Sequence, residues 1–530
     1  MNPHDTDPAW DCFNVSLPSN PYPGLRPFEK REWPIFFGRE QMIDEIIDRL
    51  VRQQLVVVHG DSGCGKSSVI RAGVLAHLEQ EGGRGGVVWR TCASRPGDAP
   101  LQLLAEALAE LDGAPGDEGR ITELRRVLNF GADAPEALAK MLRRGPSDHL
   151  CLLVDQFEEL FAFAKRHGPS DARLFVQLLV ALLERPQPGL YAVVTMRSEF
   201  LGACAQYPGF AEAVNRAQYL LPRMGHSDLV RAVREPATLY SGHVSADLAE
   251  RLISDAGGGQ DVLPLIQHGL AVLSRRKMPP EARGETPAAG AGHSWRLDLE
   301  DYRNVTGLAA MLSTHADDLA KPDDPVRFSI VEKLFRALTD INAEGQAIRR
   351  PQPLAKLVEV TGAHRATLVE IIDSFRAEGA SLLTPYAPAP LTDDGLVDIS
   401  HEALIRCWRR IADSSDPKQG WLVHEFEDGL IWRALLVQTT SFDLDPSNTL
   451  SKATADDRHE WLRRHEPMWA ERHGGNWTRV ESMITASVEA GHRAEMAERR
   501  RQTQTQKERF TFIAGVVLSV FLIVALFLNN

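Results

Sequence analysis

A glycine-rich stretch with the residues needed to bind phosphate follows an early apolar run of the chain. Residues 55–58 read as a buried strand, and the sequence continues GDSGCGKS from Gly60 to Ser67, which fits G-x-x-x-x-G-K-[ST] at every fixed position. Glycines let backbone N–H groups point inward as a nest for phosphate oxygens, and the helix that follows directs its positive end at the same anion. The residues expected at the nucleotide are Gly60, Asp61, Ser62, Gly63, Cys64, Gly65, Lys66, Ser67 and Ser68.

Two of these side chains have chemistry of their own. The Lys66 ammonium is expected to reach the β- and γ-phosphates, and the Ser67 hydroxyl is expected to ligate Mg²⁺. ATP or ADP with Mg²⁺ is therefore the predicted ligand. A GTPase is disfavoured because the chain has no N-K-x-D motif to read the base.

A second apolar strand, residues 150–154, ends in an acid. Asp155 lies at its carboxyl end, where a carboxylate can hold Mg²⁺ through water. Glu158 and Glu159 follow on a turn, and either could orient an attacking water. A solvated acidic face is the alternative for this pair.

A third apolar strand, residues 190–197, ends in Thr195 and Arg197. Both fall at the carboxyl edge of the expected sheet, where ligands of α/β proteins bind. Arg197 is a candidate for the γ-phosphate because a guanidinium offers a planar fork of donors. A salt bridge at the sheet edge is the alternative.

These motifs require a parallel sheet to bring them together. Strands are expected at residues 55–58, 87–91, 150–154, 190–197 and 217–221, with helices at 100–111, 134–144 and 171–183 among the connections. Alternating strands and helices predict a mostly parallel α/β sheet with helices on both faces. An irregular apolar segment precedes a helix that begins near residue 40, either as a loop over the adenine or as a packed N-terminal arm.

Helices dominate the rest of the chain. Residues 226–276 are expected to be helical, with Ser227 and Ser245 as N-caps, and Pro264 either opens a helix, which its position favours, or lies against the base. Residues 279–294 read as an irregular loop, followed by helices at 299–319 and 325–338. A helix at 365–378, strands at 381–386 and 396–399, and a final helix that starts near His401 predict a winged helix. For His401, simple helix-start polarity is the alternative to a ligand contact.

Composition limits the partners. The chain has 530 residues, a net charge of −13 and six cysteines without a C-x-x-C pair, which fits a reduced protein without a disulfide framework or zinc site. The net negative charge and the two bases against three acids of the helix at 365–378 make nucleic-acid binding unlikely.

The last residues form a different kind of segment. Residues 510–528, FTFIAGVVLSVFLIVALFL, contain no charge and would span about 28 Å as a helix, close to a bilayer core of ~30 Å. The basic side chains that precede them favour a cytoplasmic location for the bulk of the chain: Arg499, Arg500, Arg501, Lys507 and Arg509. A single-pass C-terminal tail anchor in the membrane is predicted, with a buried core helix as the alternative.

Taken in order, several segments resemble one family. NPYPGLRPF, FFGRE, GDSGCGKSS, LLVDQFEELF, VVTMRSEF, GGQDVLPLIQ and ISHEALIRCW resemble the novel STAND class of P-loop NTPases over residues 20–411. The resemblance implies that Phe37, Gly38 and Arg39 lie over the adenine, that Asp155 is the Mg²⁺ acid, and that Glu158 and Glu159 match the acidic pair of NACHT-type members. It also implies that Arg197 senses the γ-phosphate, that Pro264 contacts the base and that His401 reads the ADP β-phosphate.

The resemblance also implies an AAA-like nucleotide domain, a helical lid and a winged helix, to which the composition of the chain adds the other parts. The expected parts are a disordered N-terminus (1–19), an AAA-like nucleotide domain (20–224), a helical lid (225–320), a winged helix (321–413), a helical region (414–506) and the transmembrane helix (510–528). The resemblance implies a switch that is closed with ADP and oligomeric with ATP. Our first hypothesis places this switch in signalling or defence, with the tail as a membrane anchor or an effector. Gln156 replaces a second acid of many relatives, so we expect at most slow ATPase activity. Relatives often continue after a membrane-like helix into a sensor domain, which we expect to be missing, truncated or supplied by a partner protein. The alternative is a nucleotide-regulated scaffold or membrane-tethered winged-helix regulator without significant hydrolysis.

Overall fold

The computed structural model describes residues 17–81, 86–279, 294–303, 306–342, 345–413, 415 and 419–528. The chain divides into two compact units. Unit 1 comprises residues 1–328, 369–391 and 396–409, and unit 2 comprises residues 329–368, 392–395 and 410–530. Disorder was predicted for residues 1–19, of which residues 1–16 lie outside the described residues, as does most of the predicted loop at 279–294.

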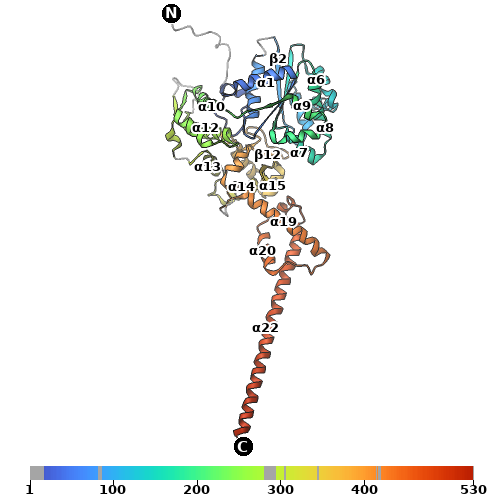
Figure 1. Ribbon diagram of the computed structural model, residues 1–530, viewed down its shortest axis with the longest axis vertical. Coiled ribbons are helices and arrows are strands. Elements are labelled where there is room, and N and C mark those ends of the chain that lie inside the picture. The colour runs from blue at the N-terminus through green and yellow to red at the C-terminus, as the bar shows by residue number, and fades with distance from the viewer. Residues whose placement is uncertain are drawn as a thin grey trace. The chain divides into compact units, whose positions relative to one another are not determined.

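A five-stranded parallel sheet is the centre of unit 1 (Figure 1). Its strands are β1 (Leu55–Gly60), β2 (Val88–Ser94), β3 (Asp148–Val154), β4 (Leu190–Arg197) and β5 (Gln218–Leu220). They lie in the order β2-β3-β4-β1-β5, so β4 separates the phosphate-loop strand from the strand that ends before Asp155. Gly60 is in register with Arg197, and Val154, just before Asp155, is in register with Val194. All three candidate motifs therefore meet at one edge of the sheet.

Both faces of the sheet are buried, as the apolar strands require. Alternate residues of β1 point to opposite sides: Val56 and Val58 belong to one core, and Leu55 and Val57 belong to the other. The first core is closed by α1 (Glu40–Gln53) and by the phosphate-loop helix, which runs through α2 (Lys66–Ser68), the π-helical η3 (Val69–Leu75) and α3 (Ala76–Glu81). The second core is closed by α4 (Pro100–Leu111), α5 (Glu118–Leu128), α6 (Ala134–Leu142), α7 (Glu158–His167), α8 (Ser170–Glu184) and α9 (Phe210–Ala217). The predicted α/β fold is confirmed.

A helical segment follows the sheet in sequence. It contains α10 (His226–Thr238), α11 (Ala246–Ala256), α12 (Val262–Lys277) and α13 (Leu308–Ala320), with a short parallel pair of β6 (Gly242–Val244) and β7 (Trp295–Leu297). Ser245 caps α11 as predicted, by accepting the Leu248 N–H. The prediction for Ser227 was wrong, because α10 is already helical from His226 and Gly225 precedes it.

The predicted helix at 299–319 is also interrupted. The 3₁₀ turn η7 (Leu299–Tyr302) comes first, and α13 begins only after Gly307, whose φ of 117° no helix accommodates. The helix α5 was not predicted, although Ile121, Leu124 and Leu128 lie on one buried face behind the N-cap Asp117. That spacing is a signal from which it could have been found.

The segment predicted as a winged helix contains α14 (Pro325–Ala337), α15 (Leu354–Thr361), α16 (Arg365–Arg376) and an antiparallel pair of β11 (Leu383–Thr384) and β12 (Leu396–Ile399). The short helices α17 (Glu402–Cys407) and α18 (Arg409–Ala412) follow. The boundary between the two units falls within α14 and α16, so the predicted domain limits stay a prediction. The short strands β8 (Thr339–Ile341), β9 (Ala347–Arg349) and β10 (Gln352–Pro353) were not predicted, because so few residues show no periodicity.

Unit 2 ends in helices packed around tryptophans. They are α19 (Trp421–Leu444), α20 (Lys452–Leu462), α21 (Pro467–Glu471) and α22 (Trp477–Leu528). Trp432 and Trp461 are buried in this core, and the side chains of α22 contribute Val480, Met483 and Ile484.

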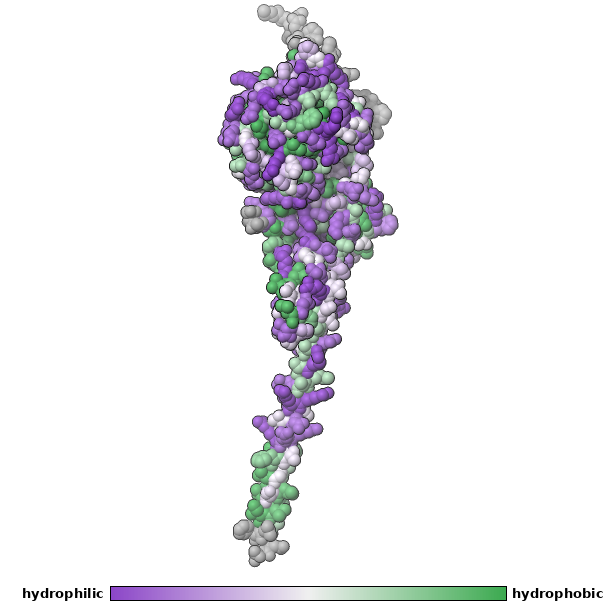
Figure 2. Space-filling model, turned by 90° about the vertical axis from the view of Figure 1, so that its right-hand side faces the viewer, coloured by the Kyte–Doolittle hydropathy of each residue, from purple (hydrophilic) through white to green (hydrophobic). Residues whose placement is uncertain are grey.

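The long helix α22 continues beyond this core without a break. Its C-terminal apolar stretch follows a hydrophilic one (Figure 2). Among the described residues, Trp477–Ala525 is a helix long and apolar enough to cross a membrane by length and composition. None of its apolar window is buried in the protein, unlike a soluble core helix.

Candidate nucleotide site

The phosphate loop joins β1 to α2 with the backbone that its glycines allow. Gly63 and Gly65 have φ values of 75° and 95°, which side chains with a Cβ rarely adopt. A Cβ on Gly63 would also lie 2.6 Å from the carbonyl oxygen of Gln260. The Lys66 ammonium donates to the carbonyl oxygens of Gly60 (3.0 Å) and Asp61 (2.7 Å), so it lies across the mouth of the loop.

The metal-side residues are in direct contact. The hydroxyls of Ser67 and Thr195 both donate to Oδ1 of Asp155, each at 2.7 Å. Asp155 is buried, and its carboxylate together with the serine hydroxyl offers the hard oxygen ligands that Mg²⁺ prefers. The two residues predicted for the metal therefore fit it.

Two arginines that the motifs do not include complete the surroundings of Asp155. Arg71, from η3, lies 3.1 Å from Oδ2, and Arg95, just after β2, lies 3.6 Å from it. Burial alone would raise the pKa of Asp155, but the two arginines and the hydrogen bonds from Thr195 and Ser67 outweigh it and lower the pKa to about 2. The carboxylate is thus ionised throughout the physiological range.

The predicted acidic pair divides into two different environments. Glu158 lies at the start of α7, where Oε1 is 3.3 Å from Nε of Arg197, and Oε2 is buried without a hydrogen-bond partner in the described chain. Burial raises the pKa of Glu158. Glu159 instead accepts the Gly97 N–H at 3.1 Å. Of the two, Glu158 has the oxygen suited to orient a water molecule.

Arg197 lies at the end of β4 beside the phosphate loop. Its guanidinium contacts Glu158, Glu199 at 3.6 Å and, most closely, Glu402 of α17. Arg197 is therefore compatible with both interpretations made from the sequence. It lies at the edge of the sheet where ligands of α/β proteins bind, and it also belongs to an ion-pair network.

Helix α17 begins directly on the phosphate loop. Nδ1 of His401 accepts the Ala403 N–H at 3.0 Å and caps the helix, so a neutral ring carries its proton on Nε2. That edge of the ring faces the loop, since a Cβ on Gly63 would lie 3.4 Å from Nε2. Next to it, Glu402 accepts a hydrogen bond from the Ser62 hydroxyl at 3.1 Å. Of these two neighbours of the loop, His401 was singled out from the sequence and Glu402 was missed.

A narrow cavity of about 160 Å³ lies beside the loop. It is lined by the loop residues Asp61–Cys64, by residues 257–260, and by Arg39 and Leu263 among others. Arg39 is buried and donates to the carbonyl oxygens of Cys64 (2.9 Å) and Pro222 (2.8 Å). Gly38 is required beside it, because a Cβ there would lie 2.7 Å from the Asp228 carbonyl oxygen.

Two predicted base contacts do not line this cavity. Pro264 is buried in α12, and its neighbour Leu263 is the side chain that reaches the cavity. Phe37 is half-buried outside the lining, and Ser68 accepts the Phe28 N–H at 3.2 Å. The roles of Phe37 and Pro264 at the base remain predictions.

A family model described as novel STAND NTPase 1 matches residues 21–427. No curated protein matches the chain. Among solved structures, the Aeropyrum pernix ORC1 protein in complex with DNA is 14% identical, with 70% of this chain and 93% of that chain covered at a TM-score of 0.36. The Walker-type ATPase paby2304 of Pyrococcus abyssi is 14% identical, with 73% and 99% covered at a TM-score of 0.33.

The family match covers well over half of the chain and contains every candidate site residue. Nucleotide binding, usually with Mg²⁺, follows from that membership and from the phosphate loop on the parallel sheet. The chain belongs to the novel STAND NTPase 1 family of P-loop NTPases.

Proposed function

We propose that the chain is a membrane-anchored, ATP-dependent switch in signalling or defence, closed with ADP and oligomeric with ATP. The observation that carries the proposal is the position of α17. His401 and Glu402, at its start, contact the phosphate loop and the arginine that would sense the third phosphate. A helix held in this way can respond to which nucleotide the loop holds.

The discrimination between ADP and ATP centres on Arg197. Its guanidinium is ion-paired with Glu402, and in the register of the sheet it lies beside Gly60 at the start of the loop. A γ-phosphate would compete with the Glu402 carboxylate for this arginine, whereas ADP would leave the pair intact. Binding of ATP therefore weakens the contact between Arg197 and the start of α17.

A second ion pair attaches α17 to the lid. Arg406 makes a bidentate pair with Asp261, at 2.5 and 2.7 Å, just before α12. Because α17 is held at both its ends, its release is expected to be cooperative rather than gradual. The closed form is thus a defined state, as a switch requires.

Hydrolysis would return the switch to its closed form. Mg²⁺, held by Ser67 and Asp155, would neutralise phosphate charge when bound. Glu158 offers the buried carboxylate oxygen for orienting water. Gln156 offers no second carboxylate beside it, which supports slow turnover.

The membrane part of the proposal rests on α22. Its apolar stretch is exposed from Phe510 to Val524, and the basic residues before it favour retention of the rest of the chain in the cytoplasm. When the nucleotide domains assemble, the apolar helices of the different copies come together in the membrane.

The test is to purify the full-length protein in an uncharged detergent, identify the bound nucleotide, and measure the particle mass with ADP and with a non-hydrolysable ATP analogue. We expect bound ADP and a small particle, and a larger particle with the analogue. Equal masses in both nucleotides would refute the switch.

A further inference from the structure

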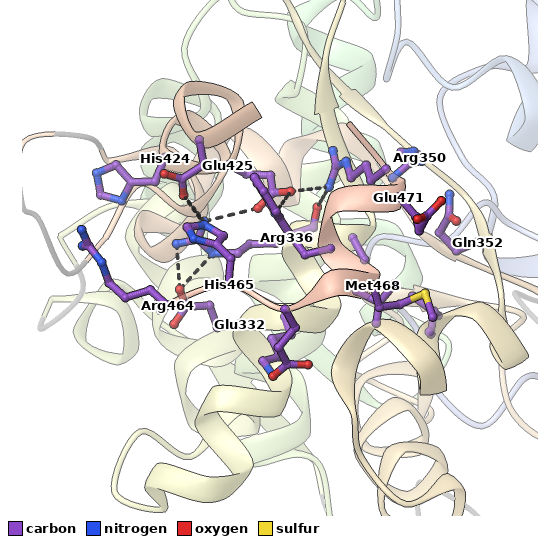
Figure 3. A pocket seen from close by; sticks show the side chains of 18 of the residues that line it. Glu332, Arg336, Arg350, Gln352, His424, Glu425, Arg464, His465, Met468 and Glu471 are labelled. Atoms are coloured by element: carbon purple, nitrogen blue, oxygen red, sulfur yellow. Dashed lines mark hydrogen bonds and ion pairs between the residues drawn. The ribbon is translucent and has the colours of Figure 1, made fainter. Parts of the chain in front are cut away.

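Unit 2 contains a cavity of about 750 Å³ that the nucleotide site does not use. This volume lies within the range of about 300–1,000 Å³ that is usual for small-molecule sites. Its walls come from α14, α19, the segment around α21, and residues 350–360, and Figure 3 shows their polar side chains around the space. The charged lining residues are Glu332, Lys333, Arg336, Arg350, Lys356, Glu425, Glu427, Asp428, Arg464, Glu466, Glu471 and Arg472.

One wall of the cavity is held rigidly by Glu425. This buried carboxylate accepts hydrogen bonds from the Trp469 indole at 2.9 Å and pairs with Arg472 at 3.1 Å, while Arg336 lies 3.4 Å away. The Trp469 ring packs on His465, at 4.2 Å between ring centres. A preorganised polar wall of this kind limits the side-chain entropy that the protein loses when a ligand binds.

Arg350 differs from the cations of that wall. It is half-buried and lines both this cavity and a neighbouring one of about 260 Å³, yet no acidic side chain of the described residues lies within ion-pair distance of it. Burial and the like charge of Arg472 lower the pKa of Arg350, and the more weakly acting charges of Asp340 and Glu425 do not offset them. Cations removed from water are ordinarily paired with an anion. An anionic group of a ligand would therefore offset the cost of burying the Arg350 guanidinium.

The rest of the lining limits how much negative charge the ligand can carry. The cavity walls hold six basic and six acidic side chains, which disfavours a polyanion. The acids Glu427 and Glu471 would instead attract a donor or cationic group at another part of the ligand. A planar guanidinium binds a carboxylate by two parallel hydrogen bonds.

We propose that this cavity binds a small organic carboxylate with one anionic group, paired with Arg350, and a hydrogen-bond donor or ammonium group elsewhere on the molecule. The site is separate from the phosphate loop, and the inference does not depend on the nucleotide switch. It gives unit 2 a ligand of its own.

The experiment titrates the full-length protein in uncharged detergent with acetate, 4-aminobutyrate, citrate and inorganic phosphate. Binding is followed by tryptophan fluorescence, because Trp469 lines the cavity. We expect saturable binding of 4-aminobutyrate, tighter than that of acetate or citrate. Arg350→Gln is expected to weaken it about 10- to 150-fold, the effect of losing a hydrogen bond between charged groups.

The matched control is Arg463→Gln, which removes the same charge from a side chain that is 71% exposed and does not line the cavity. It is expected to bind like the wild type, as is Lys66→Ala, which separates this site from the phosphate loop. If Arg350→Gln has lost its helical circular dichroism, Arg350→Lys is tested instead. Weaker binding is expected for it, because lysine lacks the planar guanidinium that binds a carboxylate by two hydrogen bonds. Absence of saturable carboxylate binding, phosphate binding alone in Lys66→Ala, or unchanged affinity in a folded Arg350 variant would overturn the proposal.

Discussion

Asp155 is a buried carboxylate whose charge is held by four neighbours. Ser67 and Thr195 donate to one of its oxygens, and Arg71 and Arg95 lie at the other. The folded state therefore prefers the ionised form, with a pKa of about 2 against about 3.9 for an unpaired aspartate. The stability that Asp155 contributes is present above the unfolded pKa and is lost as the pH falls from about 5 towards 2.

We expect Asp155→Asn to lower the stability of the nucleotide-free protein by about 2 kcal/mol or more at pH 7. The difference from the wild type should narrow as the pH falls to 3, because Asp155 then takes up its proton in the unfolded chain while it stays ionised in the folded protein. Melting temperatures of both proteins across this pH range provide the check. A difference that stays constant or widens in acid would show that Asp155 does not titrate as described.

Lys66 is the side chain on which phosphate binding depends most directly. Lys66→Ala removes the only ammonium that the described loop residues place across its mouth, so nucleotide binding should be lost. Equilibrium binding of labelled ATP measures this. Lys140→Ala, at a lysine that is 74% exposed, is the control and should bind like the wild type; unchanged affinity in Lys66→Ala would contradict the assignment.

The two glutamates after Asp155 are expected to differ. Glu158→Gln should reduce ATP turnover by about 10²- to 10⁴-fold, the usual range for a general base, because Glu158 has the free buried oxygen beside Arg197. Glu159→Gln should retain most of the turnover, since that carboxylate binds the Gly97 N–H. Phosphate release at saturating ATP distinguishes them, and the reverse order would assign the role to Glu159.

Among the individual site residues, those that belong to a continuous sequence motif could be predicted from the sequence. Gly60–Ser67 and Asp155 could be placed because fixed spacing and a preceding strand determine their position. Arg71, Arg95 and Glu402 could not, because they reach the site from different elements and only tertiary packing brings them there.

Among the elements, α17 links the site to the rest of unit 1. The resemblance predicts that its histidine contacts ADP; the histidine lies against Gly63, and the ADP contact stays a prediction. Nothing in the sequence predicts that Glu402 belongs to the site, because an acidic residue occupies the first turn of many helices. The pairs that it forms with Arg197 and Ser62 depend on a separation of more than two hundred residues along the chain.

His401→Ala is expected to weaken ADP binding by about 5- to 150-fold, corresponding to a contact of roughly 1–3 kcal/mol. Because His401 also caps α17, His401→Asn is the matched variant: asparagine is a good N-cap but lacks the Nε2 donor. Both variants should lose ADP affinity in calorimetric titrations. If His401→Asn binds ADP as the wild type does, the histidine is a cap and not an ADP contact.

For the whole molecule, the parallel sheet and the exposed apolar tail helix were within reach of the sequence, since strong patterns identify both. The division of the chain into two units was not, because its boundary falls inside α14 and α16, where the helical pattern continues unbroken. The long-range pairing of residues that creates compact units has no local signature.

The apolar end of α22 should determine membrane association. Truncation after Arg509 removes the exposed stretch and should make the protein soluble without loss of ATP binding, whereas the full-length chain should sediment with membranes. Replacement of residues 510–528 by polyleucine of equal length should restore sedimentation. Recovery of the full-length protein in the soluble fraction would contradict the anchor.

Gly515 and Ser519 add a further expectation for the assembled tails. They are four residues apart on the same side of the helix, and such small residues let helices approach closely in lipid. Without charged groups this helix lines a water-filled pore poorly, so anchoring is the expected role. Dye leakage from vesicles that carry the full-length protein with the ATP analogue would assign an effector role instead.

The central claim is that Glu402 holds the switch closed, and the rate of ADP release tests it most directly. Fluorescent ADP is chased with excess ATP from full-length wild type, Glu402→Gln and Glu199→Gln, the last removing an exposed acid that pairs with the same arginine. We predict that Glu402→Gln releases ADP about 5- to 150-fold faster than the wild type, while Glu199→Gln stays close to the wild-type rate. Equal rates for all three proteins would contradict the claim.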